Sequence, residues 1–168
     1  MKQKSFCADD LQLSNMKEVI TKYSEMVYRL AYSLTKNKYD ADDIHQDVFV
    51  KYIRKQPEFD NEEHEKAWFI RVTVNCCRNH YKTAWKRKVI SLAEFDTAGG
   101  EADAAEESEL IEVVKRLPGK YRVVIHLFYY EEMSIEEISK MLGLKASTVR
   151  TRLTRARQKL RELLGGNV

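Results

Sequence analysis

The chain has 168 residues, a formal net charge of +3 and 43% hydrophobic residues, but only two prolines and six glycines. This length suffices for one ordinary domain or two small ones, and it is too short for a large enzyme with a separate regulatory module. So little proline and glycine argues against a hairpin-rich β protein and against a disordered low-complexity chain. We therefore expect an all-α protein with modest packed cores.

The sequence carries no sign of a membrane span, a secretion signal or a disulfide framework. No stretch reaches 18 consecutive apolar residues, and the first residues lead into no apolar signal core, so we expect a cytoplasmic chain without membrane insertion. The three cysteines are Cys7, Cys76 and Cys77, and the adjacent pair lacks the spacing of a zinc knuckle. Reduced thiols and no metal or other cofactor are the expectation.

The N-terminal half contains two clear helical patterns. Apolar residues recur at steps of three and four over residues 19–34, which predicts an amphipathic helix of about five turns. We expect residues 1–16 before it to be a tail. A second helix begins near Asp40 and stops at Gln56, where Pro57 ends the pattern.

A third segment, residues 66–82, is ambiguous between strand and helix. Ile70, Val72, Val74 and Cys76 alternate as a strand would, and β-branched residues favour that state. A helix explains more of the segment, because it gathers the apolar and the polar residues on opposite faces. The apolar stripe is Ala67, Ile70, Val74, Cys77 and Tyr81, and the polar face is Arg71, Asn75, Arg78, Asn79 and Lys82.

Charge is distributed very unevenly along the chain. Arg71 to Lys88 holds six basic residues and no acid, and Lys145 to Arg161 holds seven and no acid. Between them, Ser91 to Glu112 carries eight acids and no base, with two adjacent glycines, which is typical of a linker. One basic run alone is often only a solvated face. Two such runs, interleaved with Asn, Thr, Tyr and Trp, favour a nucleic-acid partner.

The C-terminal half has the pattern of a helix-turn-helix. A short helix is expected before Pro118-Gly119, and residues 121–130 form a further apolar segment. Ser134 and Glu137 have the spacing of a capping box, and Gly143 can close the helix that they start. A longer basic helix is expected from Lys145 to Leu164. In this motif the second helix enters the major groove of DNA.

The last helix divides into an inward stripe and a basic outer surface. Near its start, the outward residues form one contiguous patch suited to base edges, with flanking residues placed to meet phosphates. The inward stripe is Val149, Leu153, Ala156, Leu160 and Leu163; the patch is Arg150, Thr151, Thr154 and Arg155; the flanking residues are Arg152, Arg157 and Lys159.

From about Lys17 to Leu164 the sequence resembles the extracytoplasmic-function group of bacterial RNA polymerase sigma factors in the sigma-70 superfamily. Three blocks carry the resemblance. Asp40–Lys51 is similar to the family's polymerase-binding helix, and Lys66–Asn75 to its promoter-melting and minus-ten-reading helix. Tyr129–Ser139 and Thr148–Arg157 resemble its minus-thirty-five-reading module. Their order, with an acidic linker before the third, makes the resemblance specific.

The resemblance implies a domain plan and a set of partners. Residues 17–88 would be sigma region 2, residues 89–107 the linker, and residues 108–168 the helix-turn-helix of region 4. The implied function is a non-catalytic promoter-specificity subunit that binds core RNA polymerase and promoter DNA to start transcription. An anti-sigma factor is a further implied partner, and the free chain is expected to be a monomer.

Particular residues are implied to carry these contacts. Those expected on core polymerase are Asp43, Gln46, Asp47 and Phe49. Those expected on the minus-ten element are Phe59, Trp68, Arg71, Asn75, Arg78, Asn79 and Lys82, with Asn75 and Asn79 facing a flipped base. Those expected on the minus-thirty-five element are Thr148, Arg150, Thr151, Arg152, Thr154, Arg155 and Arg157.

Two alternatives come from other functional classes. A stand-alone helix-turn-helix regulator would use the N-terminal bundle for dimerisation or ligand sensing, and it would bind half-sites about one helical turn apart. A metal-dependent enzyme would use Cys76, Cys77 and His80. The cysteines are about 100° apart on a helix and no second pair lies nearby, so buried packing explains them better than zinc.

Overall fold

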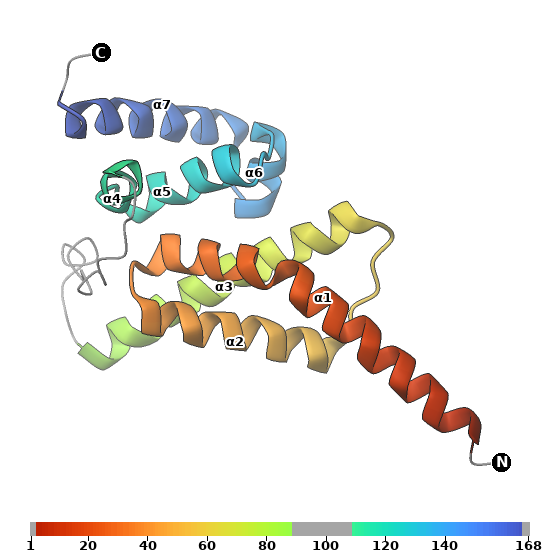
Figure 1. Ribbon diagram of the computed structural model, residues 1–168. Helices are drawn as coiled ribbons and strands as arrows, with labels where there is room; N and C mark the ends of the chain where they lie inside the picture. Colours follow the sequence, from red (N-terminus) through yellow and green to blue (C-terminus); the bar gives the residue numbers. More distant parts are fainter. Residues whose placement is uncertain (1–2, 89–108, 166–168) are drawn as a thin grey trace.

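The computed structural model describes the backbone of residues 3–88 and 109–165 and the side chains of residues 8–83 and 109–165. These residues form helices and no strand, as predicted, and the expected linker at 89–107 lies outside them. In chain order the elements are α1 (Gln3–Thr35), α2 (Lys38–Lys55), α3 (Glu62–Lys88), α4 (Glu109–Lys115), α5 (Gly119–Ile125), the π-helix η2 (His126–Tyr130), α6 (Ile135–Leu142) and α7 (Ala146–Leu163) (Figure 1).

The first three helices pack as a bundle around an aromatic centre. The ring of Phe69 lies 4.6 Å from that of Tyr23 on α1 and 5.6 Å from that of Phe49 on α2. The ambiguous segment 66–82 is helical throughout. The segment is a helix and not a strand because helical spacing places the apolar residues Ile70, Val74 and Cys77 together in this core.

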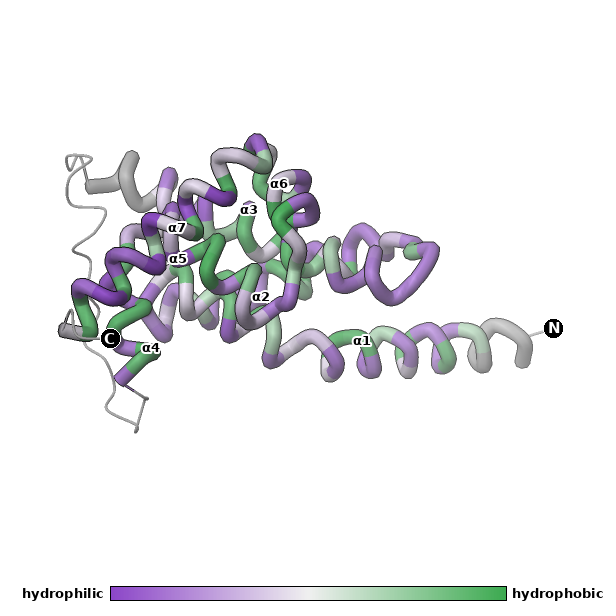
Figure 2. Tube along the Cα trace, turned by 90° about the horizontal axis from the view of Figure 1, so that it is seen from above, coloured by the Kyte–Doolittle hydropathy of each residue, from purple (hydrophilic) through white to green (hydrophobic). Residues whose placement is uncertain are grey.

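The segment expected to be an N-terminal tail is helical, since α1 already begins at Gln3. The first turns of α1 extend away from the rest of the molecule in both views (Figures 1 and 2), and residues 8–15 are all exposed. No proline or glycine occurs between residues 3 and 35. The helix nucleated by the packed segment therefore meets no residue that would stop it toward the N-terminus.

The ends of α2 show which residues set its limits. The helix begins at Lys38, two residues before Asp40, and its N-cap is Asn37, whose Oδ1 accepts from the backbone amides of Tyr39 and Asp40 at 2.8 and 3.2 Å. At the other end Gln56 takes the left-handed conformation (φ 43°), and Pro57 follows. Asn37 fits the cap because its amide oxygen satisfies two amides that have no helical partner.

The C-terminal half contains the expected helix-turn-helix. The Ser134–Glu137 capping box is present, with hydrogen bonds of 3.2 and 2.7 Å, and Gly143 closes α6 at φ 64°. Residues 121–130 divide into α5 and η2. On α7 the side chains of Val149, Leu153 and Ala156 are buried, whereas Leu163, predicted to face inward, is exposed because it lies at the free end of the helix.

We expect Ser134→Ala to destabilise the C-terminal half by about 0.5–2 kcal/mol, since it removes the acceptor for the Glu137 amide at the start of α6. Thermal unfolding of the two proteins measures the difference. Ser134→Thr keeps a hydroxyl cap and should lie close to the parent. Equal losses in both variants would contradict a role for the cap.

The two halves share one hydrophobic core. α5 packs across α1, and α6 lies against α3, so buried residues of the bundle and of the helix-turn-helix unit form one cluster. α7 lies on the outer side, away from α2 (Figure 1). Within the described ranges, no helix has the length and apolar character to cross a membrane.

Candidate nucleic-acid interface

The outer surface of α7 presents the predicted patch to solvent. Arg150, Thr151, Thr154 and Arg155 are all exposed. The hydroxyls of Thr151 and Thr154 donate to carbonyls one turn earlier, at 2.9 and 3.0 Å. These bonds hold the threonines close to the helix, so that the longer arginines reach further out.

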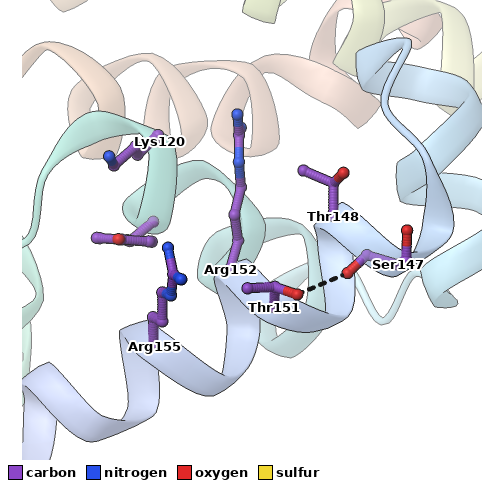
Figure 3. Close-up of a pocket in the computed structure, with 7 residues that line it drawn as sticks. Lys120, Ser147, Thr148, Thr151, Arg152 and Arg155 are labelled. Carbon is purple, nitrogen blue, oxygen red and sulfur yellow. Dashed lines mark hydrogen bonds between the residues drawn. The ribbon is translucent and has the colours of Figure 1, made fainter.

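A basic hollow lies between α5 and the first turns of α7 (Figure 3). Three of its residues are cations, three carry hydroxyls on α7, and none is acidic, a composition that suits a phosphate. The lining residues are Lys120, Tyr121, Ser147, Thr148, Thr151, Arg152 and Arg155.

Three of these lining residues, Lys120, Tyr121 and Ser147, are absent from the predicted DNA-binding set. Lys120 is the second residue of α5, and Ser147 the second of α7. The sequence does contain a signal for Lys120, because a cationic residue that directly follows Pro118-Gly119 lies at the start of a helix. Only the packing of α5 beneath α7 shows that this start faces the same hollow as Arg152.

Arg157, predicted to bind phosphate, packs against two aromatic rings of η2, those of Phe128 and Tyr129. Its Nε donates to the hydroxyl of Tyr129 at 2.8 Å, and its guanidinium carbon lies 5.6 Å from the ring centres of Phe128 and of Tyr129. Arg150 has an exposed acidic neighbour, since its Nη2 lies 3.4 Å from Glu136 Oε1. Contact between exposed charges of this kind is weak and easily exchanged for a phosphate.

The polar face predicted for α3 is also present. Arg71, Asn75, Arg78, Asn79 and Lys82 are exposed, and they follow one another at steps of four, three, one and three. Five donor side chains therefore line one side of a single helix, with three positive charges among two amides.

Trp68 and Phe59 are half-buried and pack against each other at 6.0 Å. Trp68 also meets the rings of Tyr52 at 6.1 Å and Phe69 at 5.0 Å, so its indole is anchored to the core. Asn61, in the loop between them, caps α3 by accepting from the His64 amide at 2.9 Å. The loop thus holds the two aromatic rings beside the start of the polar face.

The cysteines on α3 belong to the core. Cys76 and Cys77 are free and buried, and burial raises the pKa of the Cys77 thiol to about 12. His80 points elsewhere, with its Nε2 3.0 Å from Asp40 Oδ1. Within residues 8–83 and 109–165, no group of His, Cys, Asp and Glu is arranged to hold a metal ion. The metal-enzyme interpretation therefore finds no support in this part of the chain.

On α2, an exposed face carries Asp43, Gln46 and Asp47 as predicted. Phe49 does not share it: its side chain is 6% exposed and packs against His45 and Phe69, because it lies on the stripe that closes the core. Phe49 is therefore a core residue in this structure and is not presented to a partner as Asp43, Gln46 and Asp47 are.

Two apolar side chains extend the same face of α2. Tyr39, one turn before Asp43, is 79% exposed, and Val50, one turn after Gln46, is 38% exposed. An exposed apolar residue at each end of an acidic face is typical of a protein contact, in which apolar groups add area to charge pairing. Apolar residues such as Tyr39 and Val50 could be core residues as far as the sequence shows; the fold establishes that both are exposed.

Comparison with known proteins agrees with this architecture. The sigma-70 region 2 family matches residues 19–87, and the sigma-70 region 4 family matches residues 107–160. The RNA polymerase sigma factor SigV of Bacillus subtilis is 32% identical over 146 residues, covering 84% of this chain and 86% of SigV. The ECF RNA polymerase sigma factor SigE of Mycolicibacterium smegmatis is 30% identical over 165 residues, which cover 93% of this chain and 64% of SigE.

Two solved structures share the fold. One is the sigma factor RpoE in complex with the anti-sigma factor NepR from Bartonella quintana, with a TM-score of 0.71, 23% identity, and coverage of 89% of this chain and 96% of RpoE. The other is CnrH in complex with the cytosolic domain of CnrY, with a TM-score of 0.62, 23% identity, and coverage of 91% and 89%. At these identities the likeness concerns the fold alone.

Proposed function

Because the chain belongs to the sigma-70 family of RNA polymerase sigma factors, we propose that it is a non-catalytic promoter-specificity subunit that acts in the cytoplasm. It binds core polymerase and directs it to a promoter with two DNA elements, while the polymerase supplies the chemistry. The observation that carries the proposal is the presence, in one chain, of two separate exposed donor surfaces, on α3 and on α7.

Region 4 reads the minus-thirty-five element through α7. Arg150 and Arg155 contact guanines, and each bidentate contact contributes roughly 1–3 kcal/mol of discrimination between bases. The basic hollow holds an adjacent phosphate through Lys120, Arg152 and Thr148. The amides of Ala146 and Ser147, the first two of α7, favour the same anion, because the first amides of a helix have no carbonyl one turn earlier to bind.

Region 2 captures the minus-ten element as it opens. Unstacking a base costs a few kcal/mol, and a protein without ATP must offset this cost by binding the exposed base. The amides of Asn75 and Asn79 pair with the edge of the base, and Arg71, Arg78 and Lys82 hold the backbone. Phe59 and Trp68 support the bound base from the protein side, since Trp68 packs against the core and Phe59 packs against Trp68.

The acidic face of α2 is the surface for core polymerase. Asp43, Gln46 and Asp47 present negative charge and an amide to the clamp coiled coil of the largest subunit, and Tyr39 and Val50 add apolar area around them. The face is separated from α7 by the rest of the bundle (Figure 1). Polymerase on α2 and DNA on α7 therefore do not compete for the same surface.

An anti-sigma factor is the proposed inhibitory partner of the otherwise monomeric chain. Support comes from the solved relatives, of which one is in complex with the anti-sigma factor NepR and the other with the cytosolic domain of CnrY. The chain has the same helical fold as both.

The test against a stand-alone helix-turn-helix regulator combines two assays on the full chain. In run-off transcription on genomic fragments from the source organism, core polymerase with the protein should start at defined sites where core alone does not. In a gel shift without polymerase, the same fragments should bind weakly and show a strong salt dependence. Tight specific binding without polymerase, with no effect on run-off, would instead identify a regulator.

A further inference from the structure

A second basic hollow lies further along α7 than the one beside α5. Two of its residues are cations, one carries a hydroxyl and one an amide, and none is acidic. These groups all donate hydrogen bonds, so the hollow suits an anion such as a phosphate. We call it the distal hollow and the one beside α5 the proximal hollow. The residues that line the distal hollow are Thr154, Arg157, Gln158 and Arg161.

The two hollows lie on opposite flanks of α7. Arg152 points into the proximal hollow with Lys120 and Arg155 (Figure 3), and Arg161 lines the distal one. Positions 152 and 161 are about two and a half helical turns apart, which places them about 13.5 Å apart along the axis and on opposite sides of it. The base-edge patch connects the hollows, because Thr151 lines the proximal and Thr154 the distal one.

Arg157 is held in place before any ligand binds. It is half-buried, its Nε donates to the hydroxyl of Tyr129 at 2.8 Å, and its guanidinium carbon lies 5.6 Å from the ring centres of Phe128 and Tyr129. The bond to Tyr129 uses only the Nε proton, so the two Nη groups can still donate to a ligand. Because the planar group is already oriented, binding there loses less conformational entropy than binding at a mobile side chain.

Tyr129 adds a further donor beside the distal hollow. It is 53% exposed, and since its oxygen accepts from Arg157, its own proton is available to another group. One acid lies close by: Gln158 Nε2 donates to Glu162 Oε1 at 3.2 Å. That bond engages one of the two amide protons of Gln158 and leaves the other. A phosphate in the distal hollow would therefore meet two guanidinium groups, a hydroxyl and an amide.

The shape of DNA gives the two flanks of α7 different partners. The major groove is about 12 Å wide, and the backbone of one strand forms each of its walls. A helix with its side chains is about 10–12 Å across, so α7 nearly fills the groove when Arg150 and Arg155 reach the base edges. One flank then faces the phosphates of one strand, and the opposite flank faces those of the other.

We propose that the distal hollow binds a backbone phosphate of the second DNA strand, so that α7 contacts both walls of the minus-thirty-five major groove. The inference rests on the proposed function and extends it to Tyr129, Gln158 and Arg161, which are absent from the predicted DNA-binding set. Phosphate contacts carry no sequence information, but they fix the orientation of the protein on the duplex. Contacts on both walls prevent α7 from rolling about its axis and keep its base-reading patch directed at the bases.

Phosphate-ethylation interference on a mapped promoter tests the proposal strand by strand. Core polymerase with the full chain binds ethylated promoter DNA, and the phosphates whose ethylation prevents binding are mapped on each strand. With the parent protein, ethylation should interfere on both strands of the minus-thirty-five element. Arg157→Ala with Arg161→Ala should lose the interference on one strand and keep it on the other.

The matched control removes two cations from the proximal hollow. Lys120→Ala with Arg152→Ala should give the reciprocal pattern, in which only the other strand loses its interference. Each double variant should reduce the slope of log affinity against log salt concentration by about 2, because each neutralised phosphate contributes about 0.9. Tyr129→Phe keeps the ring and removes the hydroxyl, so it should weaken interference on the same strand as the Arg157 and Arg161 changes, and to a smaller extent.

Two outcomes would overturn the proposal. One is parent interference confined to a single strand. The other is a pattern for Arg157→Ala with Arg161→Ala that equals the parent's or is weakened alike on both strands. Run-off transcription from the same promoter separates this failure from that of the proposed function. Defined starts would leave the proposed function in place and reject only the distal hollow, whereas an absence of defined starts, with no upstream interference on either strand, would reject both.

Discussion

Replacing both Arg150 and Arg155 with alanine should abolish promoter choice while core binding stays intact. If each arginine contributes about 1–3 kcal/mol of base discrimination, the double variant loses about 2–6 kcal/mol, or roughly 30-fold to more than ten-thousandfold. Both side chains are exposed on α7, so their loss removes no core contact. Run-off transcription from a mapped promoter and from a variant with an altered minus-thirty-five element measures the loss.

The control for this prediction removes the same charge from the same helix. Lys159→Ala with Arg161→Ala takes two cations from exposed positions further along α7. It should weaken binding to all sequences about equally and reduce the salt dependence, without changing sequence preference. If Arg150→Ala with Arg155→Ala also weakened binding to all sequences equally, these arginines would contribute only non-specific attraction to the phosphate backbone. Loss of core binding in that variant would contradict the division between the two halves.

Reversing the charge at Asp43 and Asp47 should abolish holoenzyme formation. Both carboxylates lie on the exposed face of α2, one turn apart. Two lysines facing a basic partner would replace attraction by repulsion, and a loss of 2–5 kcal/mol corresponds to roughly 30-fold to several thousandfold weaker binding. A pull-down of core polymerase with Asp43→Lys and Asp47→Lys combined measures it, and thermal unfolding should change little because neither residue is buried.

Glu18→Lys provides the matched reversal outside this face. Glu18 is an exposed acid on α1, and its change should leave the pull-down at the parent level. Equal binding by all three proteins would place the polymerase surface elsewhere. Tyr39→Ala should lie between the control and the double reversal, because it removes exposed apolar area without altering charge.

Much of this architecture follows from local patterns in the sequence. The capping box of Ser134 and Glu137 and the left-handed Gly143 are set by neighbouring residues, so their spacing alone predicts where α6 begins and ends. The exposed surfaces of α3 and α7 follow from helical periodicity, because a cationic or amide side chain is rarely buried without a partner. The assignment of those surfaces to particular DNA elements came from resemblance to a family.

Other features depend on which helices meet in space. Phe49 stands one residue from the core residue Val48, and only the packing of α2 against α1 and α3 decides that its ring also turns inward. Lys120 joins the hollow on α7 because α5 lies beneath that helix. The cap on the end of α1 is supplied by Arg122, 88 residues further along the chain, and no short-range pattern links the two.

Hydroxyl-radical footprinting of the holoenzyme on a mapped promoter tests most directly the claim that one chain grips two DNA elements. We predict protection at two separated elements with the parent protein. Arg150→Ala with Arg155→Ala should lose the upstream footprint, and Asn75→Ala with Asn79→Ala should weaken the downstream one. A single continuous footprint, present without polymerase and unaffected by the α3 changes, would contradict the account.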